Sequence, residues 1–555
     1  MDPCILPSTG FDPSLLLGLT AVAILGGGLS VWAARRRSKR SGVALAVPFL
    51  VLLLLAGSQV TPPAASAAVA CPPAPAGAPA TGGGTTAPVT FEPGSAGIGD
   101  PYYPLDGNGG YDVQNYDLDL AYDPATDVLA GTATIDLVAT QNLSAFNLDF
   151  DTRDAAGADS IVIGDVRVDG ASTAFSLAST QISLVTAQPV GDGSPDAVAE
   201  PPRTELTVMP ATGILSGTEL SVEVDYAGVP ITIDDAFGLG GVLHTPDGMV
   251  PVGQPRAAAV WFPSNDHPAD KATLTMSMTV PIGLDVIGNG VLASTVDNGP
   301  TSTWTYVMDR PMATYLATAV VGDYDVQTTT VDGVTYRDAV AQSLYSQGTL
   351  GADARTALDL NPDVIAYLSS IYGPYPFTES GGIAVDLPDL GYALENQTRP
   401  IYGFIDEPTV VHELAHQWYG DDVAIERWSD IWLNEAFATY SEWLWSEDHG
   451  GDTAQQIFDD TYSLDASDPF WSVEVADPGA PRLFDNATYY RGAMTLHALR
   501  LEVGDPVFFG ILRGWAADNA GGNVSTAQFE AYASAAAGTD LSGFFDTWIH
   551  SSVKP

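Results

Sequence analysis

The chain has 555 residues, of which 46% are hydrophobic, so it is long enough for two or three domains with sizeable cores. Its 68 acidic and 20 basic residues give a formal net charge of -48, and a surface of that sign repels phosphate backbones. The composition therefore argues against a partner made of nucleic acid and against wholesale disorder. The two cysteines, Cys4 and Cys71, precede the predicted folded region, so we expect a fold without disulfides.

Residues 1–60 predict membrane or export segments. Positions 14–34 carry no charge and are long enough to span a bilayer as a helix, a basic run follows at 35–40, and a second apolar stretch covers 43–57. Two interpretations stay open: a membrane anchor within residues 14–57, or a signal peptide at 35–70. Both place the body of the chain on the extracellular side of the cytoplasmic membrane, either anchored or secreted, because the basic run stays inside.

Residues 61–96 predict a linker. The segment is rich in Pro, Ala, Gly and Thr, as in CPPAPAGAPATGGGTTAP, and such a composition cannot bury a core.

Residues 97–325 predict an antiparallel β-rich domain. Short runs of alternating apolar and polar residues recur there, and Asp-Gly and Asn-Gly pairs separate them. The clearest runs cover 116–123, 131–139, 218–226, 272–281 and 301–309.

Residues 326–555 predict a second domain of a different kind. Longer helical patterns lie at 351–371, 407–419, 430–448, 489–503 and 526–537. The fold class is therefore a multidomain α+β protein, in which an antiparallel β domain precedes a mixed, mainly helical domain.

The segment Val411-His412-Glu413-Leu414-Ala415-His416 indicates a zinc site. On a helix, His412 and His416 are four positions apart and share one face, so both imidazoles can bind one metal ion. Glu413 is adjacent to the first histidine, where its carboxylate can reach a water on the metal.

Glu435 is the candidate third ligand. It lies 19 positions after His416 on a second predicted helix, and a helix–loop–helix return brings its carboxylate to the two imidazoles. Three protein ligands plus water make an open zinc site of the catalytic kind, whereas structural zinc sites are closed by four ligands.

These residues resemble the aminopeptidase N-like zinc metallopeptidases, or gluzincins, over about residues 97–555. The family hallmark is His-Glu-x-x-His followed by 18 residues and Glu, which His412, Glu413, His416 and Glu435 match. The resemblance implies a thermolysin-like catalytic domain, one Zn²⁺ ion, and removal of N-terminal residues from peptides. It also indicates a short bacterial type of member without the helical domain that caps the site in larger members.

A second motif, Tyr392-Ala393-Leu394-Glu395-Asn396, is similar to the family's Gly-Ala-Met-Glu-Asn segment. The resemblance implies that Ala393 and Asn396 contact the substrate and that Glu395 holds its free amino group. A fixed carboxylate paired with an ammonium group decides which bond meets the metal. Near Gln254-Pro255 the family often has a second Glu for the same group, so Gln254 predicts weaker selectivity for a free amine.

A third motif, Tyr489-Tyr490-Arg491-Gly492-Ala493, resembles the family's Tyr-x-Lys-Gly-Ala segment. The resemblance implies that Tyr489 stabilises the tetrahedral intermediate, with Tyr490 as the alternative. A phenol that donates to a developing oxyanion is a known electrostatic role.

The sequence thus predicts a zinc aminopeptidase that acts as a monomer on peptides with a free N-terminus. Two alternatives stay open. One is a zinc endopeptidase on the same site, and the other is a non-catalytic cell-surface binding protein.

Overall fold

The computed structural model describes residues 89–182 and 202–555. The predicted export segments at 1–60, and residues 61–88 of the predicted linker, lie outside the described residues. Within the described part of the chain, no helix has the length and hydropathy that crossing a bilayer requires. The described residues belong to one compact unit, and the domain boundary that the sequence predicts at residue 325 stays a prediction.

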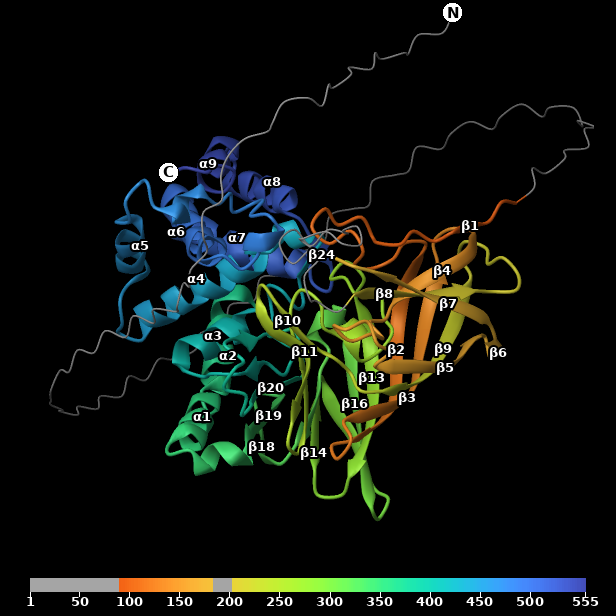
Figure 1. Cartoon of the computed structure of the whole chain (residues 1–555). Helices are drawn as coiled ribbons and strands as arrows, with labels where there is room; N and C mark the ends of the chain where they lie inside the picture. Colours follow the sequence, from red (N-terminus) through yellow and green to blue (C-terminus); the bar gives the residue numbers. More distant parts are fainter. Residues whose placement is uncertain (1–88, 183–201) are drawn as a thin grey trace, which may run out of the picture. The chain divides into compact units, whose positions relative to one another are not determined.

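The largest sheet forms the body of the β-rich part (Figure 1). In β2 every second residue is buried over most of the strand, which confirms the alternation seen in the sequence. From one edge to the other the sheet contains β15 (Val291–Asp297), β16 (Thr301–Met312), β13 (Ala272–Pro281), β2 (Tyr111–Asp123), β3 (Val128–Ala139), β9 (Glu219–Gly228), β5 (Ile161–Val168) and β6 (Ala171–Ser172).

Two further sheets complete the β-rich part. One contains β1 (Glu92–Pro93), β4 (Leu143–Asp149), β8 (Arg203–Met209) and β7 (Ala174–Thr180). The other contains β10 (Thr232–Asp235), β11 (Gly238–Thr245), β12 (Gly248–Val252), β17 (Ala319–Gly322) and β14 (Asp285–Gly288). Because β1 pairs with β4, the folded region begins inside the predicted linker rather than at residue 97.

A mixed sheet leads from the β-rich part into the helical part. It contains β18 (Tyr324–Val331), β19 (Val334–Ala341), β20 (Glu379–Ala384), β22 (Ile401–Tyr402) and β21 (Ala393–Leu394). A short parallel pair, β23 (Ala424–Ile425) with β24 (Asn523–Val524), lies further along the chain.

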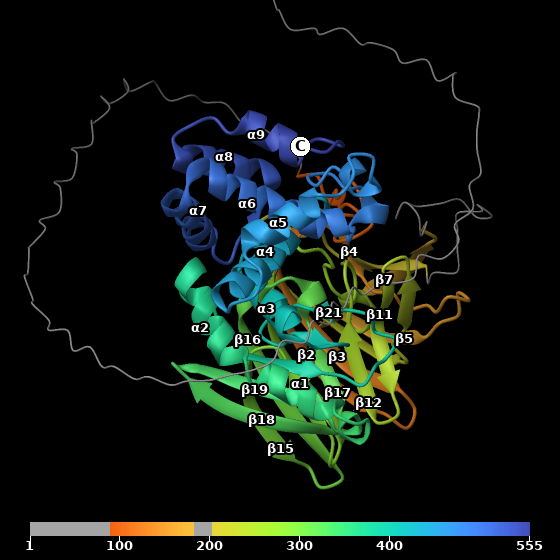
Figure 2. The same ribbon diagram turned by 90° about the vertical axis from the view of Figure 1, so that its left-hand side faces the viewer.

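The α-helices follow in chain order, and in both views α4 to α9 gather at the end of the molecule away from β2 and β3 (Figures 1 and 2). They are α1 (Leu350–Leu358), α2 (Asn361–Tyr372), α3 (Glu407–Ala415), α4 (Trp432–Asp448), α5 (Ala454–Tyr462), α6 (Gly492–Val503), α7 (Asp505–Asp518), α8 (Thr526–Ala537) and α9 (Ser542–Trp548).

Two predicted helices differ from the observed ones. The pattern at 351–371 is two helices, because α1 ends at Leu358 and α2 begins at Asn361 with a proline in its first turn. The helix predicted at 407–419 ends at Ala415, and the chain then turns through Gly420, whose φ of 134° suits only glycine. That turn returns the chain toward α4.

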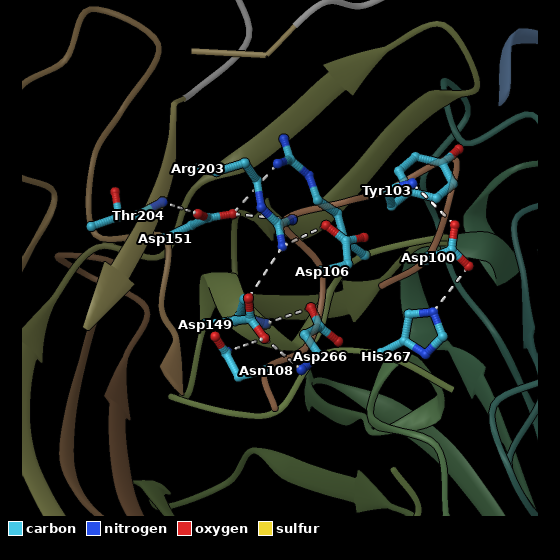
Figure 3. Close-up of polar contacts among 12 residues, drawn as sticks. Asp100, Tyr103, Asp106, Asn108, Asp149, Asp151, Arg203, Thr204, Asp266 and His267 are labelled. Carbon is cyan, nitrogen blue, oxygen red and sulfur yellow. Dashed lines mark hydrogen bonds and ion pairs between the residues drawn. The ribbon is translucent and has the colours of Figure 1, made fainter. Parts of the chain in front are cut away.

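A buried ion cluster lies inside the β-rich part (Figure 3). Arg203 is 2% exposed, and its Nη2 lies 2.9 Å from Oδ1 of Asp106 and 3.7 Å from Oδ1 of Asp149. Its Nη1 lies 3.7 Å from Oδ2 of Asp151, which Arg256 also approaches. Buried carboxylates here therefore have buried guanidinium groups beside them.

Polar contacts also join the β-rich part to the helical part. The amide of Trp428 donates to Asp100 at 2.9 Å, and Asp100 also contacts His267. Lys271 donates from Nζ to the carbonyls of Asp421 and Asp422, both at 2.8 Å, just after the turn that follows α3. The segment after α3 is therefore held by the β-rich part.

Candidate active site

Helix α3 carries the histidine pair, and its first turn is well capped. Asp406 accepts a hydrogen bond from the amide of Thr409 at 3.0 Å, and Pro408 occupies the first turn. The cap fixes where the helix starts and therefore which face His412 and His416 share.

The two imidazoles and the carboxylate of Glu435 converge. Nε2 of His412 lies 3.3 Å from Oε2 of Glu435, and Nε2 of His416 lies 3.5 Å from the same oxygen. Each of the three residues offers a ligand atom, and these atoms lie within 4.8 Å of one another. The three predicted ligands are brought together by α3 and α4.

The outer nitrogens of both imidazoles are already occupied. Nδ1 of His412 donates to Oε1 of Glu442 at 2.6 Å, and Nδ1 of His416 donates to the carbonyl of Tyr419 at 3.1 Å. These contacts leave both Nε2 atoms for a metal and fix the orientation of the rings. The donor set of two imidazoles and one carboxylate fits a zinc ion with an open position.

Glu442 was missed by the sequence analysis although a signal was present. It lies seven positions after Glu435 on α4, which is close to two helical turns, so both carboxylates occupy one face. A carboxylate behind a metal-binding histidine is the usual orienting partner.

The charges of the cluster are strongly coupled. Burial acts to raise the pKa of Glu435, but the His416 charge and the hydrogen bond with His412 hold it at about 2. Burial acts to lower the pKa of His416, and Glu435 and Glu395 nevertheless raise it to about 9. The carboxylate of Glu435 therefore stays anionic and attracts positive charge to this point.

Glu413 is buried beside the ligands, with 5% of its surface exposed. Burial raises its pKa to about 8, although the charges of His412 and His416 act to lower it. Carboxylate oxygens of Glu413 and Glu395 lie within 4.8 Å of each other and of a ring nitrogen of His416. A carboxyl group with a raised pKa at this place can exchange a proton near neutral pH.

Glu395 is held from the β-rich part of the chain. Its Oε1 accepts hydrogen bonds from Nε2 of Gln254 at 3.2 Å and from the hydroxyl of Tyr315 at 2.8 Å. Burial raises the pKa of Glu395, and the charge of His416 opposes that rise. Tyr315 was not foreseen, because it lies 80 residues before Glu395 and no local pattern links the two.

The two candidate tyrosines lie in different surroundings. Both belong to a π-helical turn at Ala487–Arg491. The ring of Tyr489 stacks on His412 with 6.0 Å between centroids, and burial raises the pKa of its phenol well above the usual value. Tyr490 is 42% exposed. Tyr489 is therefore the one that faces the metal ligands.

A cavity of about 390 Å³ contains these groups. Ala393, Gln254, Glu395, Tyr489 and Tyr490 all contribute to its wall, together with the metal ligands and Glu413. A second cavity, of about 280 Å³, shares Gln254, Ala393 and Tyr489 with the first.

Asn396 is the predicted substrate contact that the structure does not bring to either cavity. Its side chain is fully buried, and its Nδ2 donates to the carbonyl of Leu316 at 3.0 Å. The residue joins the two parts of the chain, because its neighbour Glu395 points into the site while Asn396 faces the β-rich part.

Two histidines and a glutamate that could hold one metal ion, with a second glutamate beside them and a cavity in front, match the site that the gluzincin motif predicts. A scan of protein families matches residues 406–548 to the Peptidase family M1 domain. The chain is similar to aminopeptidase N-like zinc metallopeptidases in sequence and in fold.

Individual relatives agree with this assignment. The chain is 29% identical to aminopeptidase M1-D of Oryza sativa subsp. japonica over 324 residues, which are 53% of this chain and 36% of that protein. It is 29% identical to aminopeptidase N of Lactococcus lactis subsp. lactis over 53% of this chain and 38% of that protein. The match thus spans little more than a third of the length of these relatives.

A solved structure matches over a longer range. The M1 zinc metallopeptidase of Deinococcus radiodurans is 27% identical, with a TM-score of 0.69, and the match covers 83% of this chain and 98% of that one. The similarity includes both the β-rich part and the helical part.

Proposed function

We propose that this chain is a zinc-dependent aminopeptidase that removes N-terminal residues from peptides. The observation that carries the proposal is the position of Glu395, whose carboxylate lies in the same cavity as His412, His416 and Glu435. A buried carboxylate at the end of a metal site binds an ammonium group and thereby selects a free N-terminus.

Each residue has one role in the proposed reaction. A zinc ion held by His412, His416 and Glu435 supplies a Lewis acid for the scissile carbonyl and lowers the pKa of a water molecule. Glu413 takes a proton from the attacking water and delivers it to the amine nitrogen as the C–N bond breaks.

Two side chains hold the reacting groups in place. The phenol of Tyr489 donates a hydrogen bond to the oxygen that becomes negative in the tetrahedral intermediate. Glu395 fixes the substrate ammonium group, with its Oε1 held by Gln254 and Tyr315. Gln254 adds no charge there, so the ammonium group is balanced by Glu395 alone.

The relatives support this activity. The similar proteins of Oryza sativa and Lactococcus lactis are named as aminopeptidases. A variant of the Deinococcus radiodurans M1 zinc metallopeptidase has been solved with a Tyr-Ser-Ala substrate bound. The latter match covers nearly the whole of that chain, which favours a peptide as the substrate here.

The test compares a fluorogenic leucine amide with its N-acetylated twin, using the purified full chain with and without a zinc chelator. We expect cleavage of the free amine only, and loss of that cleavage with chelator. Cleavage of both substrates would assign an endopeptidase on the same metal site. Cleavage of neither by zinc-loaded protein would contradict the proposal and favour a binding protein.

We also propose that residues 14–57 anchor or export a monomeric protein, which then acts on the extracellular side of the cytoplasmic membrane. The basic run at 35–40 between two apolar stretches supports this topology. Protease added to intact cells should then degrade the folded part, and sedimentation of that part should give one chain per particle. Protection from the protease would contradict the topology.

A further inference from the structure

The polar groups of the cavity around the metal ligands fall into two sets, one beside each histidine. Gln254 donates to Glu395, and the carboxylate of Glu395 is close to His416. Glu442 accepts from His412, and the same cavity wall includes Phe404, which precedes α3. If Glu395 holds the N-terminus beside His416, we expect the part of the peptide after the scissile bond to lie on the side of His412 and Glu442.

Exposed aromatic rings contribute to the wall of this cavity. Phe404 is 51% exposed and Tyr490 is 42% exposed, and both line the cavity. Large rings that stay open to solvent beside an active site are typical of contact surfaces. Their faces are attractive both to apolar groups and to a planar cation.

The charge of the cavity favours the cation. Its wall contains the four carboxylates of Glu395, Glu413, Glu435 and Glu442, and no Arg or Lys among the residues that the structure describes. A divalent ion offsets two of these charges and the substrate ammonium group offsets a third. The fourth charge belongs to Glu442, which keeps 26% of its side chain exposed while its Oε1 binds His412.

We propose that Phe404, Tyr490 and Glu442 form a binding site for the side chain of the second residue of the substrate, and that this site prefers arginine. The inference rests on the proposed aminopeptidase function. A guanidinium group is planar, stacks on aromatic faces and pairs with a carboxylate, so it uses all three residues at once. A glutamate at that position is repelled by Glu442.

The test uses peptides of the form Leu-X-Ala-Ala-amide, in which X is arginine, citrulline or glutamate. Citrulline has the shape of arginine without its charge. We expect kcat/KM for arginine to exceed that for citrulline by about tenfold at low salt, and to exceed it less at high salt. Glutamate should be the poorest of the three. Equal values for arginine and citrulline would overturn the proposal.

Single substitutions test which of the three residues produce the preference for arginine. Glu442→Gln keeps an oxygen that can accept from His412 but removes the charge, so the ratio of arginine to citrulline should fall to about two or less. Phe404→Leu and Tyr490→Leu should each lower the ratio as well. Because the ratio is taken within one variant, a general loss of activity does not affect it, and zinc content measured in parallel reports any displacement of His412.

Matched controls lie elsewhere in the fold. Glu447→Gln removes a carboxylate from the same helix, where Glu447 lies 3.9 Å from Arg500, and should leave the ratio unchanged. Tyr345→Leu removes a ring that is 38% exposed outside the cavity and should also leave it unchanged. A ratio that survives Glu442→Gln would overturn the assignment of Glu442.

A substrate without a second residue separates the two proposals. Leucine 4-methylcoumarin amide tests the metal, Glu413 and Glu395 alone. If it is cleaved while arginine and citrulline peptides are equal, the aminopeptidase function stands and the second-residue site is refuted. If neither the amide nor any peptide is cleaved, the proposed function fails and this inference fails with it.

Discussion

The metal cavity and the ion cluster of the β-rich part both bury several carboxylates, but they balance the charge in opposite ways. In the ion cluster, Arg203 lies among Asp106, Asp149 and Asp151 (Figure 3). Arg256 lies 3.7 Å from Asp151. In the cavity, the carboxylates have imidazoles beside them and no described guanidinium or ammonium group in the wall.

The difference shows how a structural cluster is distinguished from a reactive one. Buried charges are costly unless they are paired, so a fold that leaves carboxylates without a matching cation must obtain the positive charge from outside. At the ion cluster that charge is part of the chain. At the cavity it is expected from a metal ion and a substrate ammonium group.

The largest expected effect comes from replacing Glu413, the cavity carboxyl group that we propose transfers a proton. Glu413→Gln should keep zinc and lower kcat by about 10²–10⁴-fold, because an amide cannot accept the proton of water. Turnover of leucine amide and zinc content are measured on the same preparation. Full activity in this variant would show that Glu413 is not the base.

A second test compares the neighbouring tyrosines. Tyr489→Phe should lower kcat by about 10²–10³-fold, since it removes one donor to the developing oxyanion. Tyr490→Phe serves as the control and should stay close to wild type on leucine amide, because its ring remains. The opposite result would make Tyr490 the oxyanion donor.

A third test removes the internal cation of the ion cluster. Arg203→Met should destabilise the protein by about 3–5 kcal/mol, because it leaves buried carboxylates without their partner. Urea unfolding measures the loss, and the KM of the remaining folded protein should be unchanged. Arg167→Met, at a partly exposed set of ion pairs on β5, should cost much less.

The smallest effect is a change in pH dependence at the same cluster. Burial raises the pKa of Asp106 to about 6, although the charge of Arg203 acts to lower it. A raised pKa in the folded state means that this group stabilises the fold below about pH 4, and that the contribution is lost as the pH rises toward about 6.

Asp106→Asn keeps a neutral side chain at every pH and should abolish that loss. Between pH 4 and pH 6.5 the variant should therefore gain about 1–3 kcal/mol relative to wild type. Thermal unfolding at several pH values measures the difference. A difference that does not vary with pH would mean that Asp106 is ionised in the folded state throughout.

The sequence predicted the fold best where a single helix or strand has a clear pattern of apolar and polar residues. The helix predicted at 526–537 matches α8 residue for residue, and the strand predicted at 272–281 matches β13. The spacing of His412, His416 and Glu435 likewise predicted which residues meet, because α3 and α4 are each regular helices. The periodicity of apolar residues within one helix or strand is local, so it can be recognised from the sequence alone.

What depends on contacts between distant segments was not predictable. Tyr315 reaches Glu395 from a short 3₁₀ turn, and the end of α3 is decided by the turn at Gly420 rather than by helix propensity. Glu442 could have been found from its spacing to Glu435, but its contact with His412 depends on how α3 packs on α4. Phe404 had no pattern at all, because it belongs to a loop.

The contacts that hold Glu395 limit how this protein can be divided. The candidate metal ligands and Glu413 belong to the helical half, whereas Gln254 and Tyr315 belong to the strand-rich half. These two residues hold Glu395, the carboxylate that we propose binds the end of a peptide. A gene fragment encoding only the helices would contain the candidate metal ligands but would lack the two residues that hold Glu395. The two halves are therefore expected to be inherited and exchanged as one module.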